Sequence, residues 1–122
     1  MNEIGIESTM VEAIKNGKKT MEVRLAKPRF LLIQEGDVLS VREDFYYEGD
    51  VLDSLSNALA IKVTQILYFE SFKELFEAIN FMAVLPDAKT VEEATATYRR
   101  FYTLEDELAF GVAVFSIEPI LH

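Results

Sequence analysis

A change in hydrophobic period at Gly17 constrains the fold of this chain more than any other feature. The preceding residues place apolar side chains at helical spacing, at Met10, Ala13 and Ile14. Glycine readily adopts the left-handed conformation that follows a helix, so a helix should end here. Residues 20–25 then alternate between polar and apolar side chains, which predicts a strand. A helix followed so closely by a strand predicts a mixed α+β fold.

Hydrophobic patterning predicts further strands and helices along the chain. The strands are expected at residues 38–42, 59–69 and 110–117, and the helices at residues 72–79 and 91–101. Ser8 or Thr9 can cap the first helix, with Glu12 placed to complete a capping box from Thr9, and Ser71 and Thr90 are placed to cap the other two. Pro119 should end the last strand. These elements are consistent with a sheet flanked by helices or with a small barrel.

Two segments are less regular. Residues 43–53 are polar and acidic around Tyr46 and Tyr47, which predicts a loop or a hairpin tip. Residues 30–33 are apolar, but the run is too short for its period to distinguish a helix from a strand. Neither segment interrupts the chain as a linker would.

Size and composition predict one domain over residues 1–122. Half of the 122 residues are hydrophobic and nine are Phe, so the chain can bury a core without disulfides or metal ions. It has no cysteine, and no apolar run reaches the roughly 18 residues that a membrane-spanning helix requires. Its first residues lack the basic start and apolar stretch of a signal peptide. These features predict a cytoplasmic protein with no membrane partner.

The missing residue types limit the possible chemistry. The only histidine is His122, the last residue, which is expected to be frayed rather than catalytic. A Ser-His-Asp triad, a Cys-His pair and a histidine-rich zinc site are therefore not expected. We assign no metal-ligating residue and no cofactor. Any enzymatic chemistry would have to use Lys, Ser, Thr, Tyr or carboxylate groups.

Charge is distributed unevenly along the sequence. Residues 8–29 have a balance of +4, so the remaining residues carry −13 and the whole chain −9. A basic region on an acidic body suits one anionic group or a short single strand. The acidic remainder disfavours duplex DNA, whose phosphates would repel it. A solvated helix end is the alternative explanation for the same lysines.

The segment from Val11 to Arg24, a helix leading into the sequence GKKTMEVR, resembles the signature of the ASCH domain family. Three later features are similar to that family in order and spacing: residues 36–37, 71–75 and 101–114. The resemblance therefore spans nearly the whole chain. It implies a PUA-like fold, which is a small mixed β-barrel flanked by helices. It also implies a cleft beside residues 17–24 that binds RNA or a nucleotide-like ligand.

The candidate ligand-binding residues come mainly from the GKKTMEVR segment. They are Lys18, Lys19, Thr20, Glu22, Arg24 and, from the later stretch, Tyr102. Strand alternation would place Thr20, Glu22 and Arg24 on one face. Tyr102 could stack on a base. The alternative is that Glu22 and Arg24 only form an ordinary surface ion pair.

An enzymatic role remains an alternative. Some bacterial members of the family that this chain resembles remove the acetyl group from acetylcytidine with a Lys, a Thr and a Glu. The resemblance places the catalytic Lys at Lys19, but Glu22 stands where the catalytic Thr is expected. Three hypotheses are therefore open: an RNA- or nucleotide-binding domain, an amidohydrolase that uses Lys19 and Glu22, and a protein-interaction domain that uses residues 43–53.

Overall fold

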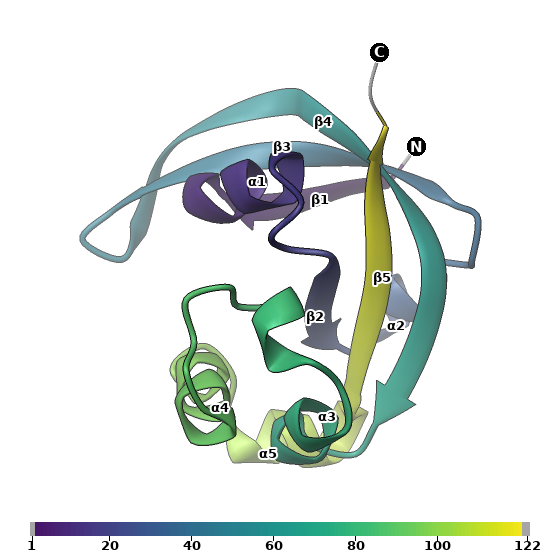
Figure 1. Ribbon diagram of the computed structural model, residues 1–122, viewed down its shortest axis with the longest axis vertical. Coiled ribbons are helices and arrows are strands. Elements are labelled where there is room, and N and C mark those ends of the chain that lie inside the picture. Colours follow the sequence, from purple (N-terminus) through teal and green to yellow (C-terminus); the bar gives the residue numbers. More distant parts are fainter. Residues whose placement is uncertain (1, 121–122) are drawn as a thin grey trace.

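Within residues 2–120, the part of the chain that the computed structural model describes, five strands form one curved mixed sheet (Figure 1). The strands are β1 (Asn2–Glu7), β2 (Met21–Leu25), β3 (Val38–Tyr47), β4 (Asp50–Phe69) and β5 (Val112–Ile120). Their order in the sheet is β1-β3-β4-β5-β2, with β1 parallel to β3 and all other neighbours antiparallel. This architecture confirms the predicted α+β, PUA-like class.

The two edge strands of the sheet, β1 and β2, are connected by a side chain. The strand order ends at β1 on one side and at β2 on the other, so the described strands form a barrel-like sheet that is not closed by a ladder. Arg24 of β2 extends its guanidinium to β1, where Nη2 donates to the carbonyl oxygen of Gly5 at 2.7 Å. This contact brings the two edges together at one place, and that place is the floor of the cleft described below.

The helices cover two regions of the sheet (Figure 1). They are α1 (Ser8–Lys15), α2 (Pro28–Leu31), α3 (Phe72–Ala78), the 3-10 helix η1 (Phe81–Ala83), α4 (Val91–Arg99) and α5 (Leu104–Phe110). Helix α1 lies against β1 and β3, whereas α3, α4 and α5 gather at the opposite end of the molecule. The predicted caps of α3 and α4 are confirmed, because Ser71 Oγ and Thr90 Oγ1 accept from the backbone N–H groups of Glu74 and Glu93.

The start of α1 differs from the prediction, and its end agrees with it. The N-cap is Glu7, without a side-chain cap, because β1 runs directly into the helix. Thr9 therefore lies inside the helix, and its hydroxyl donates to Glu7 Oε1 instead of forming a capping box with Glu12. At the other end Gly17 has φ +81° and Lys18 N donates to Ala13 O, a Schellman closure.

Residues 43–53 form a hairpin, the second of the two predicted possibilities. Strand β3 continues to Tyr47 and β4 begins at Asp50. Glu48 and Gly49 both have positive φ at the turn, as a two-residue type I′ connection requires. Asp44, Asp50 and Asp53 therefore lie on paired strands, and Glu48 lies in the turn. The ambiguous residues 30–33 lie in and just after the short helix α2, which begins at Pro28.

Strand β1, helix α5 and the 3-10 helix η1 were not predicted, and several predicted boundaries were wrong. Strand β3 continues to Tyr47, β4 begins already at Asp50, and Phe110 ends α5 instead of beginning β5. Strand β1 was missed, although Ile4 and Ile6 alternate and are both buried. Helix α5 was also missed, although Thr103 Oγ1 accepts from Asp106 N in the same capping pattern used correctly elsewhere. Pro119 does not end β5, which continues to Ile120. Strand β2 pairs with β5 only as far as Ser116, so beyond it one side of β5 tolerates a residue without an N–H donor.

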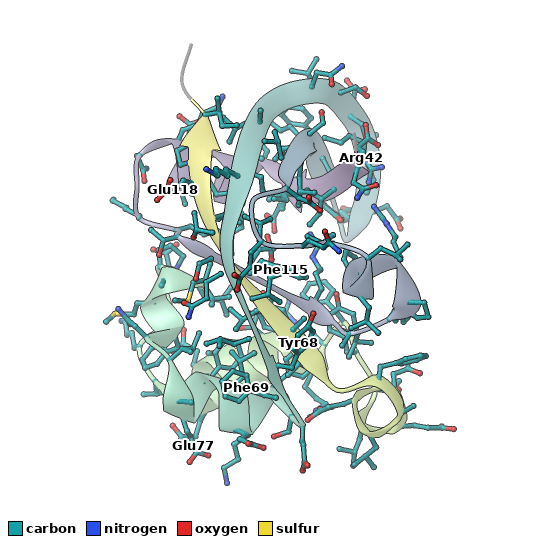
Figure 2. All side chains as sticks on the ribbon, turned by 90° about the vertical axis from the view of Figure 1, so that its right-hand side faces the viewer. Arg42, Tyr68, Phe69, Glu77, Phe115 and Glu118 are labelled. Atoms are coloured by element: carbon teal, nitrogen blue, oxygen red, sulfur yellow. The ribbon has the colours of Figure 1, made fainter. Side chains whose placement is uncertain are left out.

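Apolar side chains collect in two clusters, one on either side of β5. The first lies beneath α1 and contains Val11, Ile14 and Phe115, the last of which is labelled near the centre of Figure 2. The second joins α3 and α4 to the sheet through Phe72, Phe76 and other side chains. In residues 2–120 no helix is long and apolar enough to cross a membrane. His122 lies outside the described residues, so its predicted fraying stays a prediction.

Candidate ligand-binding cleft

A cleft of about 540 Å³ lies between the sheet edge, the hairpin turn and α4. Its walls include the backbone of Gly5 and the side chains of Glu22, Arg24, Tyr46, Tyr98 and Tyr102. These residues come from β1, β2, β3, α4 and the turn that follows α4. The turn of the hairpin lies above α4 in Figure 1, so segments far apart in the sequence face one another across the cleft.

Glu22 places a buried carboxylate at this cleft. Its side chain is 8 % exposed, and Oε1 accepts from the N–H of Val23 at 3.0 Å. Oε2 lies 3.8 Å from Lys19 Nζ, which is too far for a hydrogen bond. Every fully buried side-chain N or O atom in residues 2–120 has a hydrogen-bond partner. Because Oε2 has none, this oxygen is reached from the cleft.

Lys19 lies behind Glu22 and does not line the cleft. Its residue is 2 % exposed, and Nζ donates to Met21 O and Val84 O, both at 2.7 Å. Burial lowers the pKa of Lys19, and the nearby Glu22 carboxylate opposes this shift. The two carbonyls accept from two of the three N–H donors of the ammonium group, and the Glu22 carboxylate lies 3.8 Å away as an ion-pair partner. Lys19 therefore ties β2 to the segment after η1 and supports Glu22 from the protein side.

Arg24 lies beside Glu22 on the same face of β2. Its Nε is 3.8 Å from Glu22 Oε1, and its side chain is 20 % exposed. One N–H of Nη2 is used on Gly5 O, and the guanidinium also lies 5.7 Å from the ring centroid of Phe30. A guanidinium has five N–H donors. Within the described chain, Arg24 thus retains donors that are free for a ligand.

In the cleft wall that Arg24 contacts, Gly5 lets the side chains of Arg42 and Asp44 come close to the backbone of β1. A Cβ at this position would lie 2.2 Å from Arg42 Nη2 and 2.6 Å from Asp44 Oδ2. Arg42 donates through Nε to Asp44 Oδ1 at 2.8 Å, and this bond lowers the pKa of the buried Asp44 carboxyl. Arg42 is labelled at the upper right of Figure 2. Without a side chain, Gly5 allows this ion pair to lie against β1.

Aromatic rings form the α4 side of the cleft. Phe72 stacks on Tyr98 and Tyr102 with centroid distances of 5.1 and 5.5 Å, and the two tyrosines are 6.2 Å apart. Burial raises the pKa of both tyrosine hydroxyls, and Glu22 adds to the shift in each case. Tyr46 approaches from the hairpin and is about half exposed. The cleft therefore combines aromatic surfaces with a carboxylate and a guanidinium.

The remaining predicted residues lie elsewhere. Lys18 is exposed in the turn after α1, and Thr20 has an exposed side chain while its backbone bonds to Ala83 and Ile117. Neither lines the cleft. The basic region is dispersed in space, since Lys27 lies over the ring of Phe110 and Arg29 donates to Glu3 O. The structure thus brings together Glu22, Arg24 and Tyr102 and separates them from the exposed lysines.

Several cleft residues were not predicted from the sequence. Gly5 and Ile6 belong to the missed strand β1, and Leu85 follows η1. Arg100, which the charge analysis did not connect to residues 17–24, also lines the cleft next to Tyr98 and Tyr102. The indication in the sequence for the aromatic side of the cleft was the helical spacing of Tyr98, Phe101 and Tyr102 at the end of a predicted helix. It did not indicate which of these rings faces β2.

The raised pKa of Tyr98 predicts a specific loss of stability in alkali. Because the unfolded chain ionises near pH 10 and the folded protein only at higher pH, stability is full below pH 10 and falls above it. Between pH 8 and pH 11 the free energy of unfolding of the unsubstituted protein should fall by about 1.4 kcal/mol more than that of Tyr98→Phe. Urea unfolding of both proteins from pH 8 to pH 11 measures this, and parallel pH curves would contradict it. Lys19 titrates in both proteins and cancels in the difference.

Comparison with known proteins gives a family and two similar structures. The sequence profile of the ASCH domain family matches residues 4–121. The crystal structure of a hypothetical protein, PH0355, has 37% sequence identity and a TM-score of 0.81, with 97% of each chain covered. The solution NMR structure of protein PF0455 from Pyrococcus furiosus has 35% identity and a TM-score of 0.76, covering 99% of this chain and 98% of that one. No functionally curated protein matches the sequence.

Proposed function

The chain belongs to the ASCH domain family, and we propose that it binds a nucleotide, or one nucleotide of a single-stranded RNA, in the cleft beside β2. The observation that carries this proposal is the buried Glu22 carboxylate, which has an unbonded oxygen in a cleft walled by tyrosines. A polar group of this kind fixes the orientation of a ligand whose remaining surface is apolar. A nucleobase has this combination of a flat apolar face and a polar edge.

The size and lining of the cleft suit one nucleotide. Small-molecule sites typically span about 300–1,000 Å³, and this cleft has a volume of about 540 Å³. Stacking on Tyr98, Tyr102 or Tyr46 would contribute roughly 1–3 kcal/mol per base. Arg100 at the cleft provides a cation for the phosphate. The net charge of −9 favours such a local contact over an extended duplex.

The position of Lys19 favours binding over hydrolysis. A catalytic amine must reach the substrate within hydrogen-bonding distance. Lys19 Nζ is instead held by Met21 O and Val84 O, on the protein side of Glu22. Its role in our proposal is therefore to position Glu22. The amidohydrolase hypothesis would require Lys19 to leave both carbonyls unsatisfied in a buried place, which is costly.

Arg24→Ala tests the proposed function directly. We expect fluorescence polarisation with short single-stranded RNAs at low salt to detect binding, and this substitution to weaken it about tenfold or more, because a charged hydrogen bond contributes roughly 1.5–3 kcal/mol. Lys18→Ala is the matched control, since Lys18 is exposed and outside the cleft, and it should change affinity less than Arg24→Ala. Thermal unfolding verifies that each variant is folded. Absence of binding at low salt, or equal affinity of both variants, would refute the proposal.

A further inference from the structure

We infer that the cleft selects guanine among the nucleobases. This inference rests on the proposed function, because it assumes that a base enters the cleft, and it concerns which base that is. The cleft floor carries a carboxylate and a guanidinium side by side on β2, with Nε of Arg24 3.8 Å from Oε1 of Glu22. The two groups present acceptors next to donors, in a fixed order along the strand.

The carboxylate of Glu22 is an acceptor with spare capacity. A carboxylate has four lone pairs, two on each oxygen. Within the described chain only one of them accepts a hydrogen bond, from Val23 N. The side chain is 92 % buried, because only 8 % of it is exposed. A buried acceptor of this kind favours a ligand that brings N–H donors to it. Lys19 Nζ lies 3.8 Å from Oε2 on the protein side of this carboxylate.

The guanidinium of Arg24 is the complementary donor. Its Nη2 bond to Gly5 O holds the group against β1, and the Phe30 ring lies 5.7 Å away. These two contacts fix the orientation of Arg24 and leave N–H donors without a partner in residues 2–120. A ligand that fills the cleft should therefore offer an acceptor next to Arg24 and donors next to Glu22.

Guanine matches this order better than the other bases do. Its pairing edge carries O6 as an acceptor beside two donors, N1–H and the N2 amino group. The two donors suit a carboxylate and O6 suits a guanidinium. Adenine and cytosine place a ring-nitrogen acceptor beside their amino group, and this nitrogen would face the carboxylate. Uracil offers one N–H between two carbonyl oxygens, of which one would face Glu22.

The aromatic walls do not discriminate between bases, so the choice of base depends on polar groups of the cleft. Stacking on tyrosine tolerates every base, because all bases have a π face. Tyr98 is held by Phe72 and Phe76, so it is a rigid surface, and Tyr46 lies on the hairpin. Glu7, Thr97 and Arg100 also line the cleft, and selectivity in this inference comes from the adjacent Glu22 and Arg24. Leaving a buried carboxylate opposite an acceptor is the penalty that disfavours the wrong bases.

The experiment is isothermal titration calorimetry, which measures the affinity of the intact protein for GMP, IMP, AMP, CMP and UMP in one buffer. A well-matched bidentate contact discriminates by roughly 1–3 kcal/mol, so GMP should bind about tenfold or more tighter than AMP, CMP and UMP. IMP, which keeps O6 and N1–H but lacks the 2-amino group, should fall between GMP and AMP. Glu22→Gln keeps the shape of the side chain and should reduce the preference for GMP, with folding verified by thermal unfolding.

The possible outcomes separate this inference from the proposed function. Binding of all five nucleotides with similar affinity would overturn the guanine preference and leave nucleotide binding intact. A preference for another base would do the same. Absence of binding by any of the nucleotides, together with absence of binding to short RNA, would overturn both. A GMP preference that survives Glu22→Gln unchanged would show that Glu22 does not read the base, and would also overturn the inference.

Discussion

Replacing Lys19 with methionine should lower the free energy of unfolding by about 3 kcal/mol. Methionine keeps the apolar stem of this buried side chain but removes the ammonium group. The carbonyl oxygens of Met21 and Val84 would then lose their 2.7 Å hydrogen bonds, and the Glu22 carboxylate would lose its nearest cation on the protein side. The two carbonyl oxygens would then lack this donor in a place that water reaches poorly.

Lys18→Met is the matched control for this substitution. Lys18 is the neighbouring residue, has the same side chain and is exposed, so we expect a change of about 0.5 kcal/mol or less. Urea unfolding at pH 7 measures both variants. If the two variants have equal stability, the buried Lys19 contacts contribute nothing and the proposed structural role is wrong. Reduced nucleotide affinity in Lys19→Met, measured below its unfolding transition, would be consistent with Lys19 positioning Glu22.

The burial of Lys19 illustrates what the sequence could not predict. The change of period at Gly17 correctly predicted the helix, its left-handed end and the following strand. Lysine is almost never fully buried without a partner, so a basic run predicts an exposed surface. The partner that changes this outcome is Val84, 65 residues further along the chain. Local pattern carries no information about a contact at that separation.

The cleft was predictable in part for a related reason. Strand alternation correctly put Glu22 and Arg24 on one face of β2, because that period is a local property. The opposing wall depends on how α4 packs on the sheet, which is set by the second apolar cluster. Tyr98 belongs both to that cluster and to the cleft. A sequence pattern alone would assign such a ring to the core.

Phe72→Ala should lower the free energy of unfolding by about 4 kcal/mol, because truncation of a fully buried phenylalanine leaves a large cavity. Phe76→Ala should have a similar effect, since Phe76 is 1% exposed and belongs to the same cluster. Guanidinium chloride unfolding gives both values. A loss below about 2 kcal/mol for Phe72→Ala would contradict the packing described here.

The two phenylalanines should differ in their effect on ligand binding. Phe72 stacks on both Tyr98 and Tyr102, whereas Phe76 contacts Tyr98 at 5.5 Å in a tilted geometry. The milder substitutions Phe72→Leu and Phe76→Leu preserve most of the core volume and keep both variants folded for titration with nucleotide. If Tyr102 is a stacking surface, Phe72→Leu should weaken binding more than Phe76→Leu at matched stability, because only Phe72 holds Tyr102 in place. Equal affinities would mean that the orientation of Tyr102 does not matter to the ligand, and the aromatic wall would then consist of Tyr98 and Tyr46 alone.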